Sequence, residues 1–159
     1  MKHLTLFALL FATITSWCAC GAQTASSDSE AETCNTTAHE AVLQISQNEF
    51  VERLWDYTAE GYQYNDSLPC IVDFTATWCA PCQKMVPILE ELATQYAGKI
   101  RIYQIDVDRN KQLASDLNIN GIPHFLFLPT QGEPSSVVGS RSKADMQALI
   151  EKWRKKVNG

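Results

Sequence analysis

Two cysteines three positions apart are the residues of this sequence best suited to chemistry. Cys79 and Cys82 lie in the segment Trp78-Cys79-Ala80-Pro81-Cys82, and this spacing at a helix start allows a tight disulfide. The unpaired N–H groups of the first helical turn and the helix dipole stabilise a thiolate on the first cysteine. Because the thiolate is the nucleophilic form of cysteine, the segment predicts thiol–disulfide chemistry. Pro81 fits the first turn, where a missing N–H costs little.

A zinc site is an alternative for any such pair of cysteines. Zinc takes four ligands, which usually come from a second closely spaced pair of cysteines or from paired histidines. The remaining cysteines and histidines do not form such pairs: Cys18, Cys20, Cys34, Cys70, His3, His39 and His124. We therefore expect no metal here, and no cofactor other than a redox-active disulfide between the two cysteines.

The elements that would position the pair alternate in type along the chain. Apolar runs predict strands over residues 41–45, 71–74, 100–107, 125–128 and 136–139. Helices are predicted after the capping box at 46–49, from about 79 to 96, at 111–117, and after residue 142. The order β-α-β-α-β-α-β-β-α predicts an α/β fold, a central mixed sheet with helices on both faces and an antiparallel hairpin at one edge.

The composition suits one domain of this kind. The chain has 159 residues, of which 45% are hydrophobic and 19% charged, which is enough for a core and too apolar for a disordered protein. A formal net charge of −5 argues against a nucleic-acid-binding protein, which would carry a basic surface. No apolar run approaches the roughly 18 residues of a membrane-spanning helix. We expect a monomer that does not bind nucleic acid.

Residues 1–20 predict an export signal. A basic start at Met1-Lys2-His3 precedes an apolar stretch over 4–14 and then small and sulfur-containing residues. A buried core helix is the alternative, but the polar stretch that follows does not suit one. We expect export to the periplasm or cell envelope, where disulfides persist.

Cys20 is the expected site of lipid attachment. It follows the small residue Ala19 and so resembles a bacterial lipoprotein signal, although Trp17 replaces the usual aliphatic residue. Simple cleavage near residues 21–22 is the alternative. Residues 21–39 are rich in Ser, Thr, Ala, Asp and Glu and predict a flexible tether. The tether would join this membrane anchor to a domain at 40–159.

The stretch from Val72 to Cys82 is similar to the active-site strand and helix start of the thioredoxin family. Further matches cover most of residues 40–157: Pro87, Asp106-Val107-Asp108, Gly121-Ile122-Pro123, Gly132 and Gly139. With its export signal the chain looks most like thioredoxins of the envelope of Bacteroidetes-type bacteria. The resemblance implies a thioredoxin fold and a thiol–disulfide oxidoreductase. Its partners would be proteins with disulfides or thiols, and an upstream electron donor.

The resemblance also implies a role for each residue of the pair. Cys79 would attack a substrate disulfide, and Cys82 would resolve the mixed disulfide. Asp73 would lie beneath the pair and exchange a proton with Cys82. Its place in an apolar strand favours burial, which raises a carboxyl pKa, over the alternative of a strand-end charge in water.

Five residues would form the surface that binds substrate: Trp78, Ala80, Pro81, Ile122 and Pro123. The resemblance implies a cis Pro123, which leaves the Ile122 backbone free to pair with an extended substrate. An ordinary turn proline is the alternative. For Trp78 a purely structural role in the core is an equal alternative.

Three positions depart from the family pattern. Ala80 replaces a glycine and affects the redox potential, and Thr75 replaces a tryptophan. Gln104 stands where relatives often have a lysine, so the pKa of Asp73 is expected to be higher than in those relatives.

Other functions remain open on the sequence alone. Reduction of envelope proteins is the favoured direction, with net oxidation or isomerisation as the alternative. A Cu(I)-binding module with His124 as third ligand is a rival, although a structural histidine with satisfied hydrogen bonds is favoured at that position. A purely structural adaptor is another rival. Cys70 is expected to be a buried free thiol, with a Cys34–Cys70 disulfide as the alternative.

Overall fold

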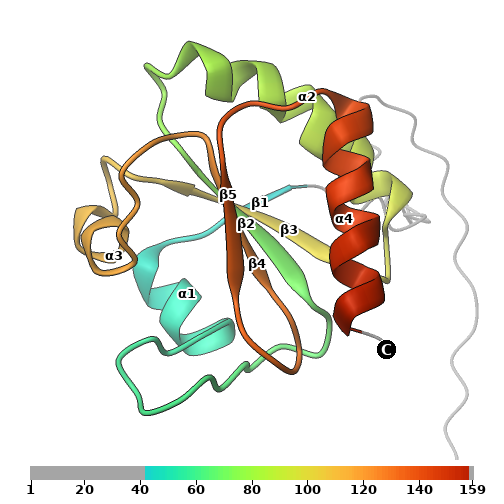
Figure 1. The fold of residues 1–159 in the computed structure, drawn as a ribbon. Coiled ribbons are helices and arrows are strands. Elements are labelled where there is room, and N and C mark those ends of the chain that lie inside the picture. The colour runs from blue at the N-terminus through green and yellow to red at the C-terminus, as the bar shows by residue number, and fades with distance from the viewer. Residues whose placement is uncertain (1–41, 158–159) are drawn as a thin grey trace, which may run out of the picture. The chain divides into compact units, whose positions relative to one another are not determined.

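Five strands form the sheet at the centre of residues 42–157, the part of the chain that the computed structural model describes (Figure 1). They are β1 (Leu43–Gln44), β2 (Cys70–Thr75), β3 (Arg101–Asp106), β4 (His124–Leu128) and β5 (Ser135–Val138). The spatial order is β1-β3-β2-β4-β5. Strands β1, β3 and β2 are parallel, while β4 is antiparallel to β2 and β5 to β4. The predicted element order, mixed sheet and edge hairpin are confirmed.

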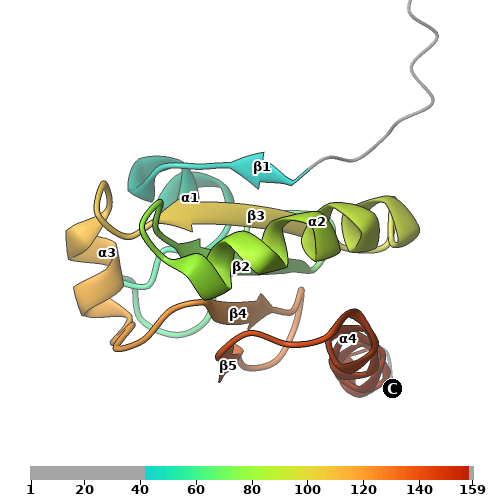
Figure 2. The same ribbon diagram turned by 90° about the horizontal axis from the view of Figure 1, so that it is seen from above.

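Helices cover both faces of this sheet. They are α1 (Gln47–Arg53), α2 (Ala80–Gln95), α3 (Lys111–Asp116) and α4 (Lys143–Val157). Helices α2 and α4 pack on one face and α1 and α3 on the other, as Figures 1 and 2 show. Each face has its own buried apolar cluster, and β2 contributes residues to both. The sheet is thus a continuous apolar layer between two pairs of helices.

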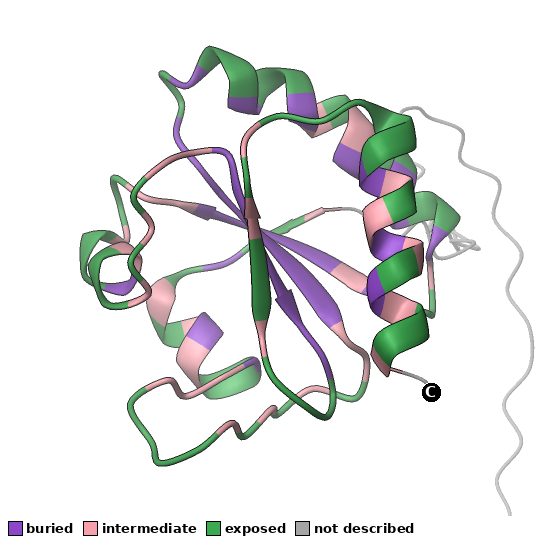
Figure 3. Ribbon diagram, in the orientation of Figure 1, coloured by how far each residue is buried: buried purple, intermediate pink, exposed green. Residues whose placement is uncertain are grey.

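Strand β2 is buried along its whole length (Figure 3). Cys70, Val72 and Phe74 belong to the cluster under α1 and α3. Ile71 belongs to the cluster under α2 and α4, and Asp73 points to the same face because side chains alternate along a strand. Burial of each large apolar side chain contributes about 1.5–3 kcal/mol, so this strand is held firmly in place. Residues at its carboxyl end are therefore positioned rigidly.

Helix starts follow the signals in the sequence. The Ser46 side chain accepts a hydrogen bond from the Glu49 N–H, and the Ser46 N–H donates to Glu49 Oε2 at 2.8 Å. This confirms the predicted capping box. At α4, Ser142 Oγ accepts from the Asp145 N–H at 3.1 Å.

An aromatic loop, which no pattern in the sequence predicted, joins α1 to β2. Trp55 and Tyr64 form an isolated antiparallel bridge, and the ring of Tyr62 meets that of Trp55 edge-on at 5.5 Å. These rings, with Tyr57, pack against the cluster under α1 and α3. The loop therefore extends the core at the end of β2 that lies away from the cysteine pair.

The predicted signal at 1–20, the lipid site at Cys20, the tether at 21–39 and Cys34 lie outside the described residues. Within 42–157 no helix has the length and apolar character to cross a membrane. Cys70 is a buried free thiol, as expected.

We expect Ser46→Ala to lower the free energy of unfolding by about 1 kcal/mol, because the Glu49 N–H loses its acceptor. Urea denaturation with an unchanged m value would measure the effect. Ser140→Ala is the matched control, since Ser140 is exposed and caps no helix, and should leave stability within about 0.5 kcal/mol. Equal effects of the two substitutions would contradict the prediction.

Candidate active site

The cysteine pair lies where β2 gives way to α2. Cys79 is the N-cap of α2, and Cys82 is in the first turn, with a Cα–Cα distance of 5.2 Å and a disulfide between them. The Cys82 N–H donates a hydrogen bond to Cys79 Sγ at 3.3 Å. After reduction the Cys79 sulfur would thus sit at a helix N-terminus, where a thiolate is stabilised.

The two sulfur-bearing residues differ in access. Cys82 is fully buried, whereas Cys79 keeps an exposed fraction of 4%, and the adjoining Ala80 and Pro81 are exposed. Ile122 packs against the small cluster that contains both cysteines. An incoming disulfide therefore reaches Cys79 before Cys82, in keeping with the predicted order of attack.

Asp73 is fully buried on the face of β2 that α2 covers. Gln104 Nε2 donates a hydrogen bond to Asp73 Oδ2 at 3.1 Å, and Gln44 Nε2 donates in turn to Gln104 Oε1 at 3.2 Å. Asp73 Oδ1 has no hydrogen-bond partner among the described residues. Desolvation raises the pKa of Asp73 to about 6, although the bond from Gln104 opposes this. The expected burial is confirmed, and the alternative of a solvated charge at the strand end is wrong.

The loop before β4 carries a cis peptide bond between Ile122 and Pro123, which confirms the expected isomer. Pro123 is buried, and its carbonyl oxygen accepts a hydrogen bond from the Gly139 N–H at 2.8 Å. Within residues 42–157 the backbone N–H and C=O groups of Ile122 make no hydrogen bond. These groups are thus available to an extended peptide beside Cys79.

Trp78 is exposed by 68%, so the alternative of a purely core role is wrong. Its Nε1–H donates a hydrogen bond to Asp108 Oδ2 at 2.7 Å. Asp108 was not among the predicted site residues, yet it fixes the indole ring beside the cysteines. The available signal was its place just after β3, since parallel strands bring their carboxyl ends to one edge of the sheet.

Thr75 and His124 are buried with unpartnered polar atoms. Thr75 Oγ1 and His124 Nδ1 make no hydrogen bond among the described residues, so the expectation of a satisfied His124 is wrong. The His124 ring meets Phe74 edge-on at 6.2 Å, and desolvation lowers its pKa. Burial against an aromatic ring leaves no polar partner for this nitrogen.

The suggested third copper ligand is not in place. Among residues 42–157, no group of three or more His, Cys, Asp or Glu side chains could hold a metal ion. His124 is therefore not grouped with Cys79 and Cys82, and the site can perform disulfide exchange with its own sulfur atoms.

Comparison with known proteins gives a consistent result. The sequence pattern of the thioredoxin family matches residues 41–152. A thioredoxin of Borreliella burgdorferi is 32% identical over 110 residues, which are 69% of this chain and 94% of that protein. A thioredoxin of Staphylococcus saprophyticus is 43% identical over 83 residues, or 52% and 79% of the two chains.

Longer plant proteins and a solved structure are also similar. A chloroplastic M-type thioredoxin of Pisum sativum is 37% identical over 99 residues, which are 62% of this chain and 55% of that protein. The crystal structure of chloroplastic thioredoxin z superimposes with a TM-score of 0.58 at 26% identity, covering 70% of this chain and 93% of the other. With its disulfide at the start of α2 and its matching fold, the chain belongs to the thioredoxin family and is a thiol–disulfide oxidoreductase.

Proposed function

We propose that the protein reduces disulfide bonds of exported proteins in the cell envelope. The observation that carries the direction is that, apart from the start of α2, few groups stabilise the Cys79 sulfur. Among the described residues, Cys79 Sγ accepts one hydrogen bond, from the Cys82 N–H, and the intervening Ala80 and Pro81 carry no charge. Proteins of this chemistry are strong oxidants when their reduced form is unusually stable. A sparsely stabilised thiolate favours the disulfide form, which makes the dithiol a reductant.

The reaction proceeds in two exchanges. The Cys79 thiolate attacks one sulfur of the substrate disulfide, forms a mixed disulfide and releases the other substrate sulfur as a thiolate. Cys82 then loses its proton to Asp73 and attacks Cys79 Sγ, which releases the second substrate thiolate and forms the Cys79–Cys82 disulfide. Two electrons pass to the substrate, and an upstream dithiol donor must restore the reduced protein.

Asp73 suits the part of base in the second exchange. Burial raises its pKa to about 6, so the carboxylate is a stronger base than a solvated one but is still ionised at neutral pH. Its free Oδ1 can accept the proton, since Gln104 bonds only Oδ2. Gln104 supplies no positive charge, which agrees with the hypothesis of a higher pKa than in relatives with a lysine.

The location of the proposed reaction rests on the first 39 residues. A signal pattern at 1–20, the lipid site proposed at Cys20 and a tether at 21–39 would hold the domain close to a membrane surface. About 19 flexible residues have a mean span on the order of 25 Å. The protein would then meet substrates in a compartment where disulfides form and persist.

The reduction potential of the Cys79–Cys82 couple tests the direction. We expect a value near about −270 mV when the full chain is equilibrated in glutathione or dithiothreitol buffers, because the thiolate is sparsely stabilised. A value toward roughly −120 mV would instead support the alternative of an oxidant or isomerase.

Cys82→Ser should trap substrates, because the mixed disulfide on Cys79 then lacks its resolving thiol. Expressed as the full chain in cells, this variant should accumulate mixed disulfides with proteins that carry export signals. Non-reducing electrophoresis and mass spectrometry would identify them. The control with both cysteines replaced by serine should trap none, and partners without export signals would contradict the envelope location.

Asp73→Asn should stabilise the oxidised protein at neutral pH and not in acid. A pKa of about 6, against an ordinary 3.8, means that the folded protein binds this proton more tightly than the unfolded chain. The protonated Asp73 carboxyl therefore contributes to the free energy of unfolding of the wild-type protein. This contribution is complete below about pH 4 and is lost as the pH rises through 6. At pH 7.5 the free energy of unfolding of Asp73→Asn should exceed that of the wild type by about 3 kcal/mol, because each unit of difference in pKa corresponds to ~1.4 kcal/mol.

Urea denaturation at pH 4 and pH 7.5 would measure this difference. The exposed Glu133→Gln is the matched control and should show no such growth with pH. A gain for Asp73→Asn that is equal at the two pH values would contradict the assigned desolvation.

A further inference from the structure

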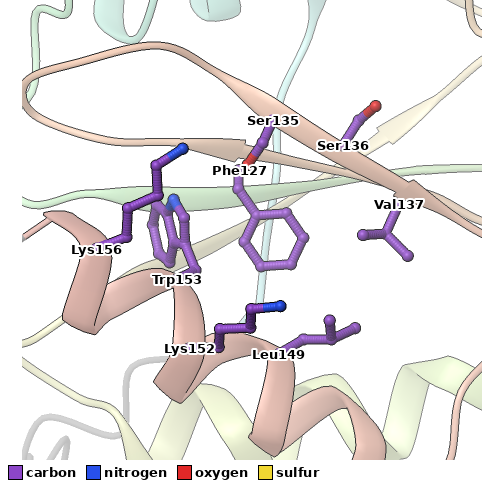
Figure 4. Close-up of a pocket in the computed structure, with 8 residues that line it drawn as sticks. All are labelled: Phe127, Ser135, Ser136, Val137, Leu149, Lys152, Trp153 and Lys156. Atoms are coloured by element: carbon purple, nitrogen blue, oxygen red, sulfur yellow. The ribbon is translucent and has the colours of Figure 1, made fainter.

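A groove runs between β5 and α4, on the side of the sheet that α4 covers (Figure 4). Its cavity measures about 430 Å³, and Phe127, Val137, Leu149 and Trp153 form an apolar floor. Lys152 and Lys156 from α4 border this floor, opposite the serines of β5. The combination of an apolar floor and cationic border suits a partner that is both apolar and acidic.

The groove continues toward the active site. A second cavity of about 350 Å³ shares Val137, Leu149 and Lys152 with the first, and it ends at Arg141 and Asp145. Arg141 follows closely on Gly139, whose N–H donates to the carbonyl of Pro123 in the cis-proline loop. A chain leaving the Cys79 surface at this loop would therefore enter the groove directly.

The cations along the groove are available to a partner. Among residues 42–157, Lys152, Lys156 and Arg141 pair with no carboxylate, in contrast to Lys143 with Glu91 and Arg154 with Glu151. Arg141 Nη2 donates a hydrogen bond to the Val138 carbonyl oxygen at 3.3 Å, so Lys152 and Lys156 are the cations that can approach the carboxylates of a partner. Asp145 is the acidic exception, and it is engaged with Ser142 at the start of α4.

Strand β5 also offers hydrogen-bonding groups. It pairs with β4 on one side, and its other edge has no neighbouring strand in the described part of the chain. Its residues are mostly exposed, including Val138 at 52%. An open edge of this kind can accept an extended peptide through backbone hydrogen bonds, while side-chain pockets supply selectivity.

We propose that β5 and α4 bind an extended acidic and apolar segment of the substrate protein, adjacent to the cysteine that Cys79 attacks. The segment adds to the free edge of β5. Its alternate side chains enter the groove, and its carboxylates lie near Lys152 and Lys156. This proposal rests on the disulfide reduction proposed above. It identifies proteins with such a segment beside the disulfide as the substrates that are reduced fastest.

The dimensions of the groove define the length of such a segment. From Asp145 to Lys156 helix α4 rises about 17 Å at 1.5 Å per residue. An extended chain covers that distance with about five residues at 3.3 Å each. A peptide with fewer than about five residues beyond its cysteine would not reach both lysines.

The test uses synthetic peptides in which a cysteine is followed by six residues that alternate apolar and glutamate side chains. Each cysteine carries a mixed disulfide to a fluorescent thiol, so that reduction by the full chain in its dithiol form can be timed. The comparison peptides replace glutamate with glutamine, or end two residues after the cysteine. We expect the long acidic peptide to react about fivefold faster than either, with the advantage falling as salt is added.

Lys152→Glu/Lys156→Glu should abolish this advantage. Lys99→Glu/Lys111→Glu makes the same change in net charge on exposed lysines that do not line the groove, and it should retain the advantage. Methylation of every second backbone amide of the peptide can begin at odd or at even positions. Only one of these two patterns should remove the rate advantage of the acidic peptide, because only every second N–H group faces β5. Equal rates for acidic and neutral peptides, or no effect of methylation in both patterns, would overturn the proposal.

A small-molecule disulfide separates this proposal from the proposed function. All variants should reduce bis(2-hydroxyethyl) disulfide at the wild-type rate, since this disulfide is uncharged and too short to reach the groove lysines. Slow reduction of it by every form, together with a high reduction potential, would count against reduction as the function. Normal reduction of it without peptide selectivity would count against the groove alone.

Discussion

The site depends on the burial of β2 between its neighbours β3 and β4. Apolar side chains hold this strand on both of its faces, so its carboxyl end has a fixed position at the edge of the sheet. The chain then turns into α2, which places Cys79 at a helix N-terminus with the Cys82 N–H directed at its sulfur. Because β3 is parallel to β2, its carboxyl end brings Asp108 to the same edge, where it holds Trp78. The positions of the Cys79 sulfur and of the Trp78 indole ring therefore both follow from the burial of β2.

Burial of Asp73 lowers the stability of the folded protein, but it also makes the carboxylate a stronger base. An apolar side chain would suit this position in the core better than a carboxyl group with an unpartnered oxygen. Yet a carboxylate in water would be too weak a base to take a proton from a thiol efficiently. Desolvation moves its pKa toward neutrality, and the hydrogen bond from Gln104 limits how far. The fold thus accepts a destabilising group where the proposed second exchange needs a base.

Local signals in the sequence predicted much of this structure. Period-2 and helical patterns gave the element order, the capping box at Ser46 gave the start of α1, and the cysteine spacing located the start of α2. What they missed depends on contacts between distant residues. The bond between Trp78 and Asp108 spans 30 positions, and the unsatisfied nitrogen of His124 reflects the packing around it. The aromatic loop before β2 has no regular period, so no pattern in the sequence indicated how its rings would pack.

Disulfide exchange at the cysteine pair does not depend on the side chains of the substrate, so other parts of the surface must distinguish one substrate from another. The groups around Cys79 that can bind a substrate are largely backbone: a helix N-terminus and the Ile122 peptide groups. Backbone groups bind any extended chain, so they cannot select one substrate over another. Selectivity therefore needs side chains beyond the reacting sulfur atoms. The groove beside β5 provides an apolar floor and two lysines that pair with no carboxylate among residues 42–157, along a path that starts at the cis-proline loop. With the proposed groove, such an oxidoreductase would keep one reaction centre while the charge of a neighbouring surface decides which disulfides reach it.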